Sequence, residues 1–189
     1  GSAALKLAGA YGGAADTLAY ALDVPRVDEL TPLVARFAPG AVPPKTAGAL
    51  AARGWITGPV PSAGFTVDAQ GSALAWGDGW RVAKLDVAAS VAPGIAAAGA
   101  VPLSARPVTL AVTAADVAAP VGAFPVVRAN VSGTLAQHAG TFAVKGEGID
   151  ADARVSGGLA EAKRADGTRD LAWSGTVATL DNRGVIPFR

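Results

Sequence analysis

Few side chains of this chain could carry covalent or redox chemistry. Among its 189 residues there is one histidine, His138, and no cysteine. A catalytic histidine needs a nucleophile and an orienting carboxylate beside it, and the sequence has no Gly-x-Ser-x-Gly motif that would supply a serine. We interpret His138, at the end of a strand-like segment, as a structural turn residue. A hydrolase using Ser and Asp is an alternative that a Ser and a carboxylate next to His138 would support.

Two further motifs formally match ligand sites around Gly146 to Asp152. Gly146-x-Gly-x-x-Ala151 fits a dinucleotide fingerprint, but that motif requires a following helix to hold the pyrophosphate, and alternating strand-like residues follow it here. Asp150 and Asp152 resemble one copy of a calcium-binding repeat, which works in tandem copies. We interpret these carboxylates as a solvated strand face, and we predict no metal, no cofactor and no enzymatic activity.

The amino-acid composition argues against some classes of binding partner. With 16 basic and 15 acidic residues the net charge is +1, so the clustered basic face of nucleic-acid-binding proteins is not expected. Hydrophobic residues make up 51% and aromatic residues 6%, which spreads the apolar surface over Ala and Val. Every apolar run is shorter than the roughly 18 residues of a membrane helix. The chain lacks Met and begins with Gly1-Ser2, so we expect a tag scar on a fragment of a longer protein that forms one domain, residues 1–189.

Alternating apolar and polar residues dominate the C-terminal third, which is the pattern of half-buried strands. Val127, Ala129 and Val131 alternate with Arg128 and Asn130. The segments that we predict as strands there are 127–138, 142–145, 149–156 and 171–180. One face of the resulting sheet is therefore expected to be apolar and the other hydrated.

The N-terminal part follows the same rule with one exception. Residues 5–11 and 18–24 predict a hairpin, and further strands are expected at 50–56, 65–76, 85–91 and 108–112, with a turn at Gly77-Asp78-Gly79 and a connection over 120–125. Residues 28–37 instead place apolar side chains three and four apart, with Asp28 and Glu29 in front, which predicts a short helix.

A weak repeat links the last segments. Ser132-Gly-Thr-Leu-Ala136 returns as Ser174-Gly-Thr-Val-Ala178. Such self-similarity favours an elongated architecture in which each unit contacts its neighbours.

These residues resemble the repetitive periplasmic region of the TamB family and, more loosely, the wider AsmA-like lipid-transfer proteins. The resemblance covers most of the chain and lies in the order of short segments rather than in one diagnostic motif. The segments are Asp28–Leu33, Ala49–Gly58, Gly133–His138, Leu159 after a Gly pair, and Leu171–Val177 followed by Leu180.

The resemblance implies an all-β fold, an elongated sheet curled into a trough (a β-taco) whose concave face is apolar. It also implies a non-enzymatic segment of a periplasmic conduit that binds and passes phospholipid acyl chains between the two membranes of a Gram-negative bacterium. The full-length protein would be anchored in the inner membrane and would work with an outer-membrane barrel of the Omp85 class, TamA.

The residue pattern is consistent with that function, because an apolar sheet face without helices must close on itself, dimerise or bind an apolar ligand. The residues that we expect to line the lipid groove are Leu85, Val87, Val91, Leu110, Val112, Val131, Leu135, Phe142, Val144, Ile149, Val155, Leu171, Trp173 and Val177.

Three other interpretations fit the same alternating apolar residues. They could form the core of an ordinary sandwich, or belong to a β-helical adhesin or secreted passenger that serves only as a scaffold. Within the family, the groove could instead receive unfolded outer-membrane protein strands by edge augmentation. Exposed edges at the ends of the fragment can also drive edge-strand dimerisation.

Overall fold

The computed structural model is all-β and describes residues 2–32, 36, 45–59, 62–96, 99–163 and 169–185. Ten strands form one open antiparallel sheet, and two short strands form a separate hairpin. In the large sheet these are β1 (Ala4–Gly9), β2 (Thr17–Val24), β3 (Thr46–Thr57), β4 (Gly64–Trp76), β5 (Trp80–Val91), β8 (Pro107–Ala119), β9 (Gly122–Thr134), β10 (His138–Gly146), β11 (Ile149–Lys163) and β12 (Arg169–Asn182).

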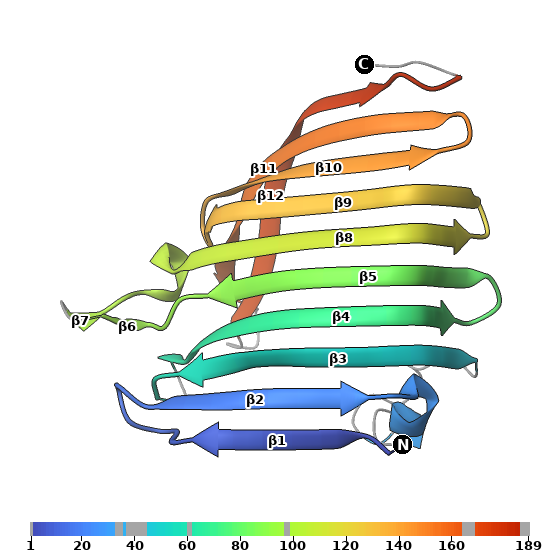
Figure 1. Ribbon diagram of the computed structural model, residues 1–189. Helices are drawn as coiled ribbons and strands as arrows, with labels where there is room; N and C mark the ends of the chain where they lie inside the picture. The colour runs from blue at the N-terminus through green and yellow to red at the C-terminus, as the bar shows by residue number, and fades with distance from the viewer. Residues whose placement is uncertain are drawn as a thin grey trace.

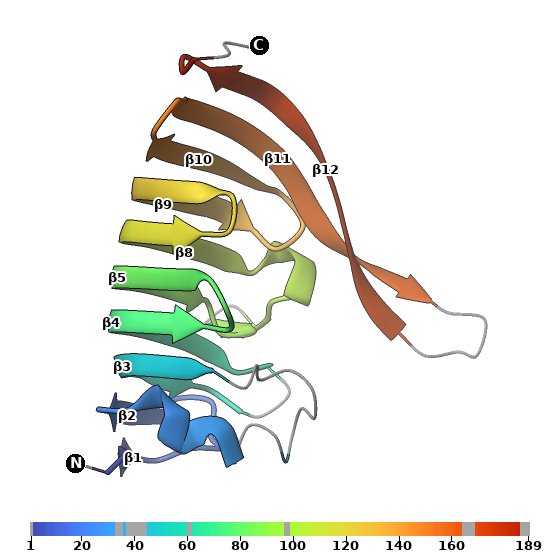
Figure 2. The same ribbon diagram turned by 90° about the vertical axis from the view of Figure 1, so that its right-hand side faces the viewer.

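Each strand of the large sheet pairs with the preceding and the following strand of the sheet, so spatial order equals chain order. The connection from β5 to β8 contains the hairpin of β6 (Ile95–Ala96) and β7 (Gly99–Ala100) and the 3-10 turn η3 (Leu103–Ala105). Figure 1 shows the resulting ladder from β1 at one edge to β12 at the other. Figure 2 shows that β11 and β12 sweep away from the plane of the earlier strands, so the elongated, curled sheet predicted from the sequence is confirmed.

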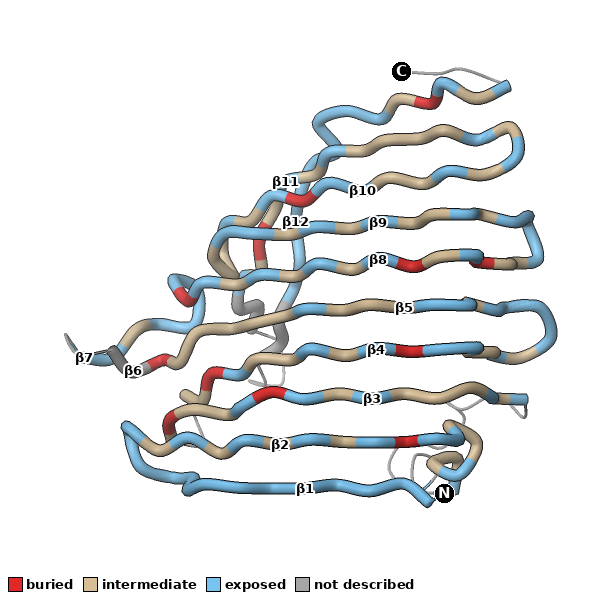
Figure 3. Tube along the Cα trace, in the orientation of Figure 1, coloured by how far each residue is buried: buried red, intermediate tan, exposed pale blue. Residues whose placement is uncertain are grey.

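The hydrophobic core is very small for a chain of this size. Among the described residues the buried hydrophobic ones are Val24, Ala114 and Val117, and Figure 3 shows that most of the trace is exposed or half-buried. The described part has no second layer that packs over the ten-stranded sheet, so the sandwich interpretation does not describe this fold. Nor does a β-helix, which stacks parallel strands, since every pairing here is antiparallel.

Two sequence-based boundaries need correction. The segment predicted as one strand over 127–138 is divided: β9 ends at Thr134, a turn occupies 135–137, and β10 begins at His138. The expected connection over 120–125 is only the two residues Pro120 and Val121, because β9 already begins at Gly122. Pro125 fits inside this strand because its counterpart in the register is Asp116, an unpaired position with φ +50° where no ladder N–H is required.

The helix predicted over 28–37 is seen in part. Val27–Leu30 form the 3-10 turn η1, and Thr31, Pro32 and Arg36 are helical, while residues 33–35 and 37 lie outside the described residues. Within the described part, no helix is long and apolar enough to cross a membrane.

A tyrosine side chain links two of the N-terminal strands by a hydrogen bond. The hydroxyl of Tyr20 in β2 reaches across β3 and donates a hydrogen bond of 2.9 Å to the carbonyl oxygen of Thr66 in β4. Gly54 of β3 lies under this bridge, and a Cβ there would lie 2.8 Å from the tyrosine hydroxyl. Burial, with a smaller effect of Asp68, raises the pKa of the Tyr20 hydroxyl.

Replacing Tyr20 with Phe removes this hydrogen bond, and we expect it to lower the free energy of unfolding by about 0.5–1.5 kcal/mol. Because the raised pKa means that the folded chain holds the phenolic proton more tightly than the unfolded chain, this contribution is complete below the ordinary tyrosine pKa and is lost as pH rises above about 10. Urea denaturation at neutral and alkaline pH measures both effects. Tyr11→Phe, at an exposed tyrosine, is the control, and equal behaviour of the two variants would contradict the bridge.

Candidate apolar binding face

The strand register sorts the side chains of the sheet into two chemically distinct faces. Successive residues of a strand point to opposite sides, and residues paired across strands point to the same side. One row that crosses all ten strands contains no charged or polar side chain. It consists of Leu5, Leu22, Ala52, Ala69, Val87, Val112, Ala129, Phe142, Ala153 and Leu180.

The next row on the same side is almost as uniform, with a tyrosine as its only polar group. It consists of Leu7, Tyr20, Gly54, Val67, Ala89, Leu110, Val131, Gly140, Val155 and Val177. We call the side of the sheet that carries these two rows the apolar face. The two rows together form a continuous strip of small and branched side chains from one edge strand to the other.

The row between them points to the opposite side and is mainly polar. It consists of Lys6, Ala21, Arg53, Asp68, Ala88, Ala111, Asn130, Thr141, Arg154 and Thr179. We call this side the polar face. The alternation that the sequence predicts for single strands is thus kept in phase over the whole sheet.

The described part of the chain leaves the apolar face uncovered along most of its length. None of the ten side chains of the first row is buried. At the two edges the exposed fractions reach 61% for Leu5 and 62% for Val177. In the interior strands, residues such as Val87 and Val112 are half-buried by their neighbours on the sheet. An apolar surface of this extent is unusual for a chain that has no ligand or partner.

Twelve of the predicted groove residues lie on the apolar face, by their pairing or by alternation along their strands. They are Leu85, Val87, Val91, Leu110, Val112, Val131, Phe142, Val144, Ile149, Val155, Trp173 and Val177. Leu135 does not belong to a strand row, because it lies in the turn between β9 and β10. Leu171 lies in β12, but its side chain is outside the described residues.

The prediction omitted the N-terminal half of the same face. Leu5, Leu7, Leu22 and Val67 continue the rows that start from the predicted residues. The alternation of residues 18–24 and 65–69 contained this signal, but only the pairing shows that these strands belong to one continuous sheet with the others.

His138 has a structural environment on this face. Its Nδ1 lies 3.2 Å from the carbonyl oxygen of Thr134, and its Nε2 accepts a 2.9 Å hydrogen bond from the indole N–H of Trp173. A carbonyl can only accept and an indole N–H can only donate, so in this arrangement Nδ1 is the donor and Nε2 the acceptor. Both ring nitrogens are thereby engaged, and neither bonds to a serine or a carboxylate.

Two glycines make room for this contact. Gly157 and Gly175 are paired across β11 and β12, and the indole of Trp173 lies against both. A Cβ at Gly175 would contact the indole ring and lie 2.5 Å from the carbonyl oxygen of Ser156. The repeated Ser-Gly-Thr segments therefore have a physical role, since Gly133, His138, Gly157 and Gly175 form one row across four strands.

We expect Gly175→Ala to push the indole off the sheet and to destabilise the fold by about 1–3 kcal/mol through overpacking. The indole N–H and His138 Nε2 resonances in NMR spectra report the lost hydrogen bond directly. Trp173→Phe, which removes the donor without crowding, should change the His138 resonance and cost less stability. An unchanged His138 resonance in both variants would contradict the contact.

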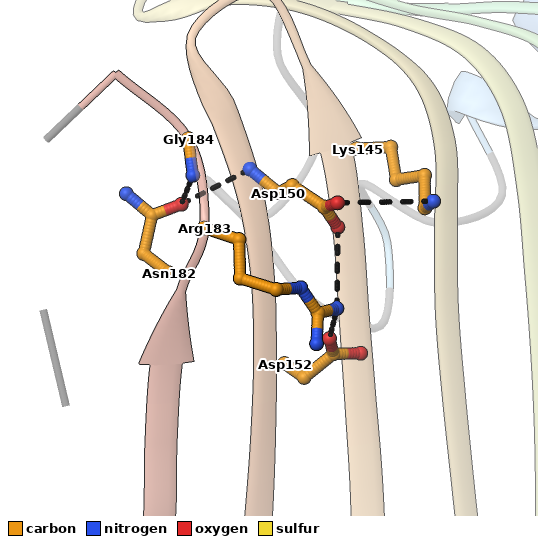
Figure 4. A network of polar contacts seen from close by, with 6 residues as sticks. All are labelled: Lys145, Asp150, Asp152, Asn182, Arg183 and Gly184. Carbon is orange, nitrogen blue, oxygen red and sulfur yellow. Dashed lines mark hydrogen bonds and ion pairs between the residues drawn. The ribbon is translucent and has the colours of Figure 1, made fainter. Parts of the chain in front are cut away.

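The carboxylates of the formal calcium motif are held in an ion-pair network instead (Figure 4). Arg183 lies 3.6 Å from Asp150 and also contacts Asp152, and Lys145 lies 3.9 Å from Asp150. Asn182 Oδ1 accepts hydrogen bonds of 3.0 Å from the backbone N–H groups of Asp150 and Gly184. The described residues contain no group of three or more His, Asp or Glu that could hold a metal ion, and Gly146 is followed by a turn and a strand rather than a helix.

Comparison with known proteins adds no family to this geometry: no protein-family model, no curated protein and no solved structure matches the chain. The TamB resemblance of the sequence therefore stays a prediction.

Proposed function

We propose that this chain is a non-enzymatic segment that binds phospholipid acyl chains on its apolar face and passes them along the sheet. The observation that carries the proposal is the in-phase alternation of ten strands, which leaves an unbroken and largely uncovered apolar strip.

The dimensions of the strip suit an acyl chain. Neighbouring strands are about 4.8 Å apart, so a row across ten strands is about 43 Å long. The hydrocarbon layer of one leaflet is about 15 Å deep, half of a bilayer core. A row is therefore longer than a single extended acyl chain, which leaves distance over which a bound chain can shift.

The energetics favour a continuous wall over separate pockets. Exposing an acyl chain to water costs about 0.8 kcal/mol for each CH₂ group. Along the apolar face a chain leaves one Ala or Val side chain as it meets the next, so its exposed area stays nearly constant. The small side chains of the two rows also leave space for the ligand above the sheet.

The cellular setting of the proposal comes from the TamB resemblance. It comprises the periplasm, an inner-membrane anchor in the full-length protein, transfer of phospholipid between the two membranes, and an Omp85-class barrel as partner. We likewise propose that the apolar face is the concave lining of a longer trough.

A second candidate ligand is an unfolded outer-membrane protein strand. All six residues of β1 are exposed, and among the described strands β1 has a hydrogen-bonded neighbour only on its β2 side. A free edge of this kind pairs with an added strand through its backbone groups, and the same edge could pair two copies of the chain.

Two adjacent residues of β9 test the acyl-chain proposal. Val131 lies on the apolar face and is half-buried, whereas Ser132 is paired with Thr109 and points to the polar face. We expect Val131→Asp to weaken binding of a tail-labelled fluorescent phospholipid by about tenfold or more, the loss of roughly two CH₂ contacts.

Ser132→Asp introduces the same charge one residue away and should leave binding nearly unchanged. Circular dichroism establishes that both variants fold. Equal losses in the two variants, or none in either, would contradict binding on the apolar face. Leu135→Asp, in the turn that borders this face, should behave like Val131→Asp.

A further inference from the structure

The apolar face includes a partly enclosed region, a cavity of about 640 Å³ near the end of β5. Its floor is formed by Phe65 and Val91, which are paired on the apolar face. Its walls come from three other parts of the chain, namely Pro102–Ser104, Leu135–Ala136 and Leu159–Ala160. The cavity therefore opens directly onto the strip that we propose as the acyl-chain surface.

Backbone hydrogen bonds hold these walls together. The turn after β9 bonds on one side to the η3 segment, through Leu135 N–H to Arg106 O at 3.0 Å and Ala136 N–H to Ser104 O at 2.9 Å. On the other side Leu159 N–H donates to Leu135 O at 2.7 Å. Gly158 permits this close approach, because a Cβ there would collide with the backbone of Ala136. The walls of the cavity are thus fixed by backbone hydrogen bonds of the fold.

Among the described residues, Arg106 is the one charged residue that lines the cavity, and it is only 6% exposed. Its Nε donates a 2.6 Å hydrogen bond to the carbonyl oxygen of Ala92, and an Nη donates to that of Ala63. These bonds tie together the adjoining ends of β4 and β5. They use two of the five guanidinium N–H donors.

No carboxylate neutralises this charge within the described residues, since none forms an ion pair with Arg106. Among the described residues, the cavity lining also includes no Asp or Glu. Burying an unpaired charge is costly, and carbonyl dipoles compensate it only in part. The cavity therefore combines an apolar lining with an uncompensated positive charge, which is the chemistry that recognises an anionic amphiphile.

We propose that this cavity is a head-group site for an anionic phospholipid, with the phosphate at Arg106 and the first acyl methylenes over Phe65 and Val91. The inference rests on the proposed function and adds selectivity to it. Phospholipids of both kinds carry a phosphodiester that can accept hydrogen bonds from the guanidinium. A zwitterionic lipid also brings an ammonium or choline cation close to Arg106, and the described lining offers no carboxylate for it.

Leu103 provides the sharpest test, because it lines the cavity and is 38% exposed, so a polar residue is tolerated there. The probes are short-chain phosphatidylglycerol, short-chain phosphatidylcholine and glycerol 3-phosphate, titrated calorimetrically into the chain below their micelle concentrations. We expect the wild-type chain to bind phosphatidylglycerol about tenfold more tightly than phosphatidylcholine, because the buried guanidinium repels the choline cation. Glycerol 3-phosphate, which lacks acyl chains, should bind much more weakly than either lipid.

Leu103→Glu places a carboxylate in the lining and should abolish the preference, whereas the matched neutral variant Leu103→Gln should keep it. Equal affinity for the two lipids, or the same preference in both variants, would overturn the head-group site and leave the acyl-chain function standing. If neither lipid binds, the head-group site and the acyl-chain function are both overturned. Tight binding of glycerol 3-phosphate would show an anion site unrelated to lipid.

Arg106→Gln removes the charge itself. If circular dichroism shows the native fold, the variant should bind the two lipids equally. A folded Arg106→Gln chain that still prefers phosphatidylglycerol would overturn the role of Arg106, and the Leu103 pair decides the question if the variant does not fold.

Discussion

The in-phase alternation of side chains across ten hydrogen-bonded strands is the constraint on which this structure depends. A one-residue slip at any strand pair would turn the apolar side chains of every later strand to the other face. With Val24, Ala114 and Val117 as the buried hydrophobic residues of the described part, little core packing exists to correct such a slip. Register is instead maintained by the antiparallel backbone ladders and by cross-strand contacts between neighbouring side chains. Specific side-chain hydrogen bonds, such as that from the Tyr20 hydroxyl to the carbonyl oxygen of Thr66, contribute as well.

Local irregularities preserve this phase where the sequence would break it. In β12, Val177 and Leu180 are three residues apart and would point to opposite faces in a regular strand. The register shifts there, because Val177 pairs with Val155 and Thr179 pairs with Arg154, which leaves Ala178 as an extra residue. Such a bulge returns both side chains to the apolar face. The bulge in β12 thus keeps the apolar strip continuous up to the last strand of the sheet.

The sequence predicted well those features that depend on alternating residues within a strand. It predicted poorly those that depend on contacts between segments far apart in the chain. The all-β class, the hairpin of β1 and β2 and twelve predicted residues of the apolar face follow from alternation, and the turn at Gly77–Gly79 follows from its glycines. The position of Leu135 did not, because a turn between alternating segments leaves no break in the pattern. Arg106 carried no local signal either, since its burial depends on the carbonyl groups of Ala63 and Ala92, 43 and 14 residues away.

Native mass spectrometry of the purified chain, with organic extraction of whatever accompanies it from the expression host, tests the central claim most directly. An apolar face that is open to ligands should retain phospholipid through purification, in complexes whose added mass matches the extracted lipids. A lipid-free monomer, or a lipid-free dimer that covers the same face with a second copy, would contradict it.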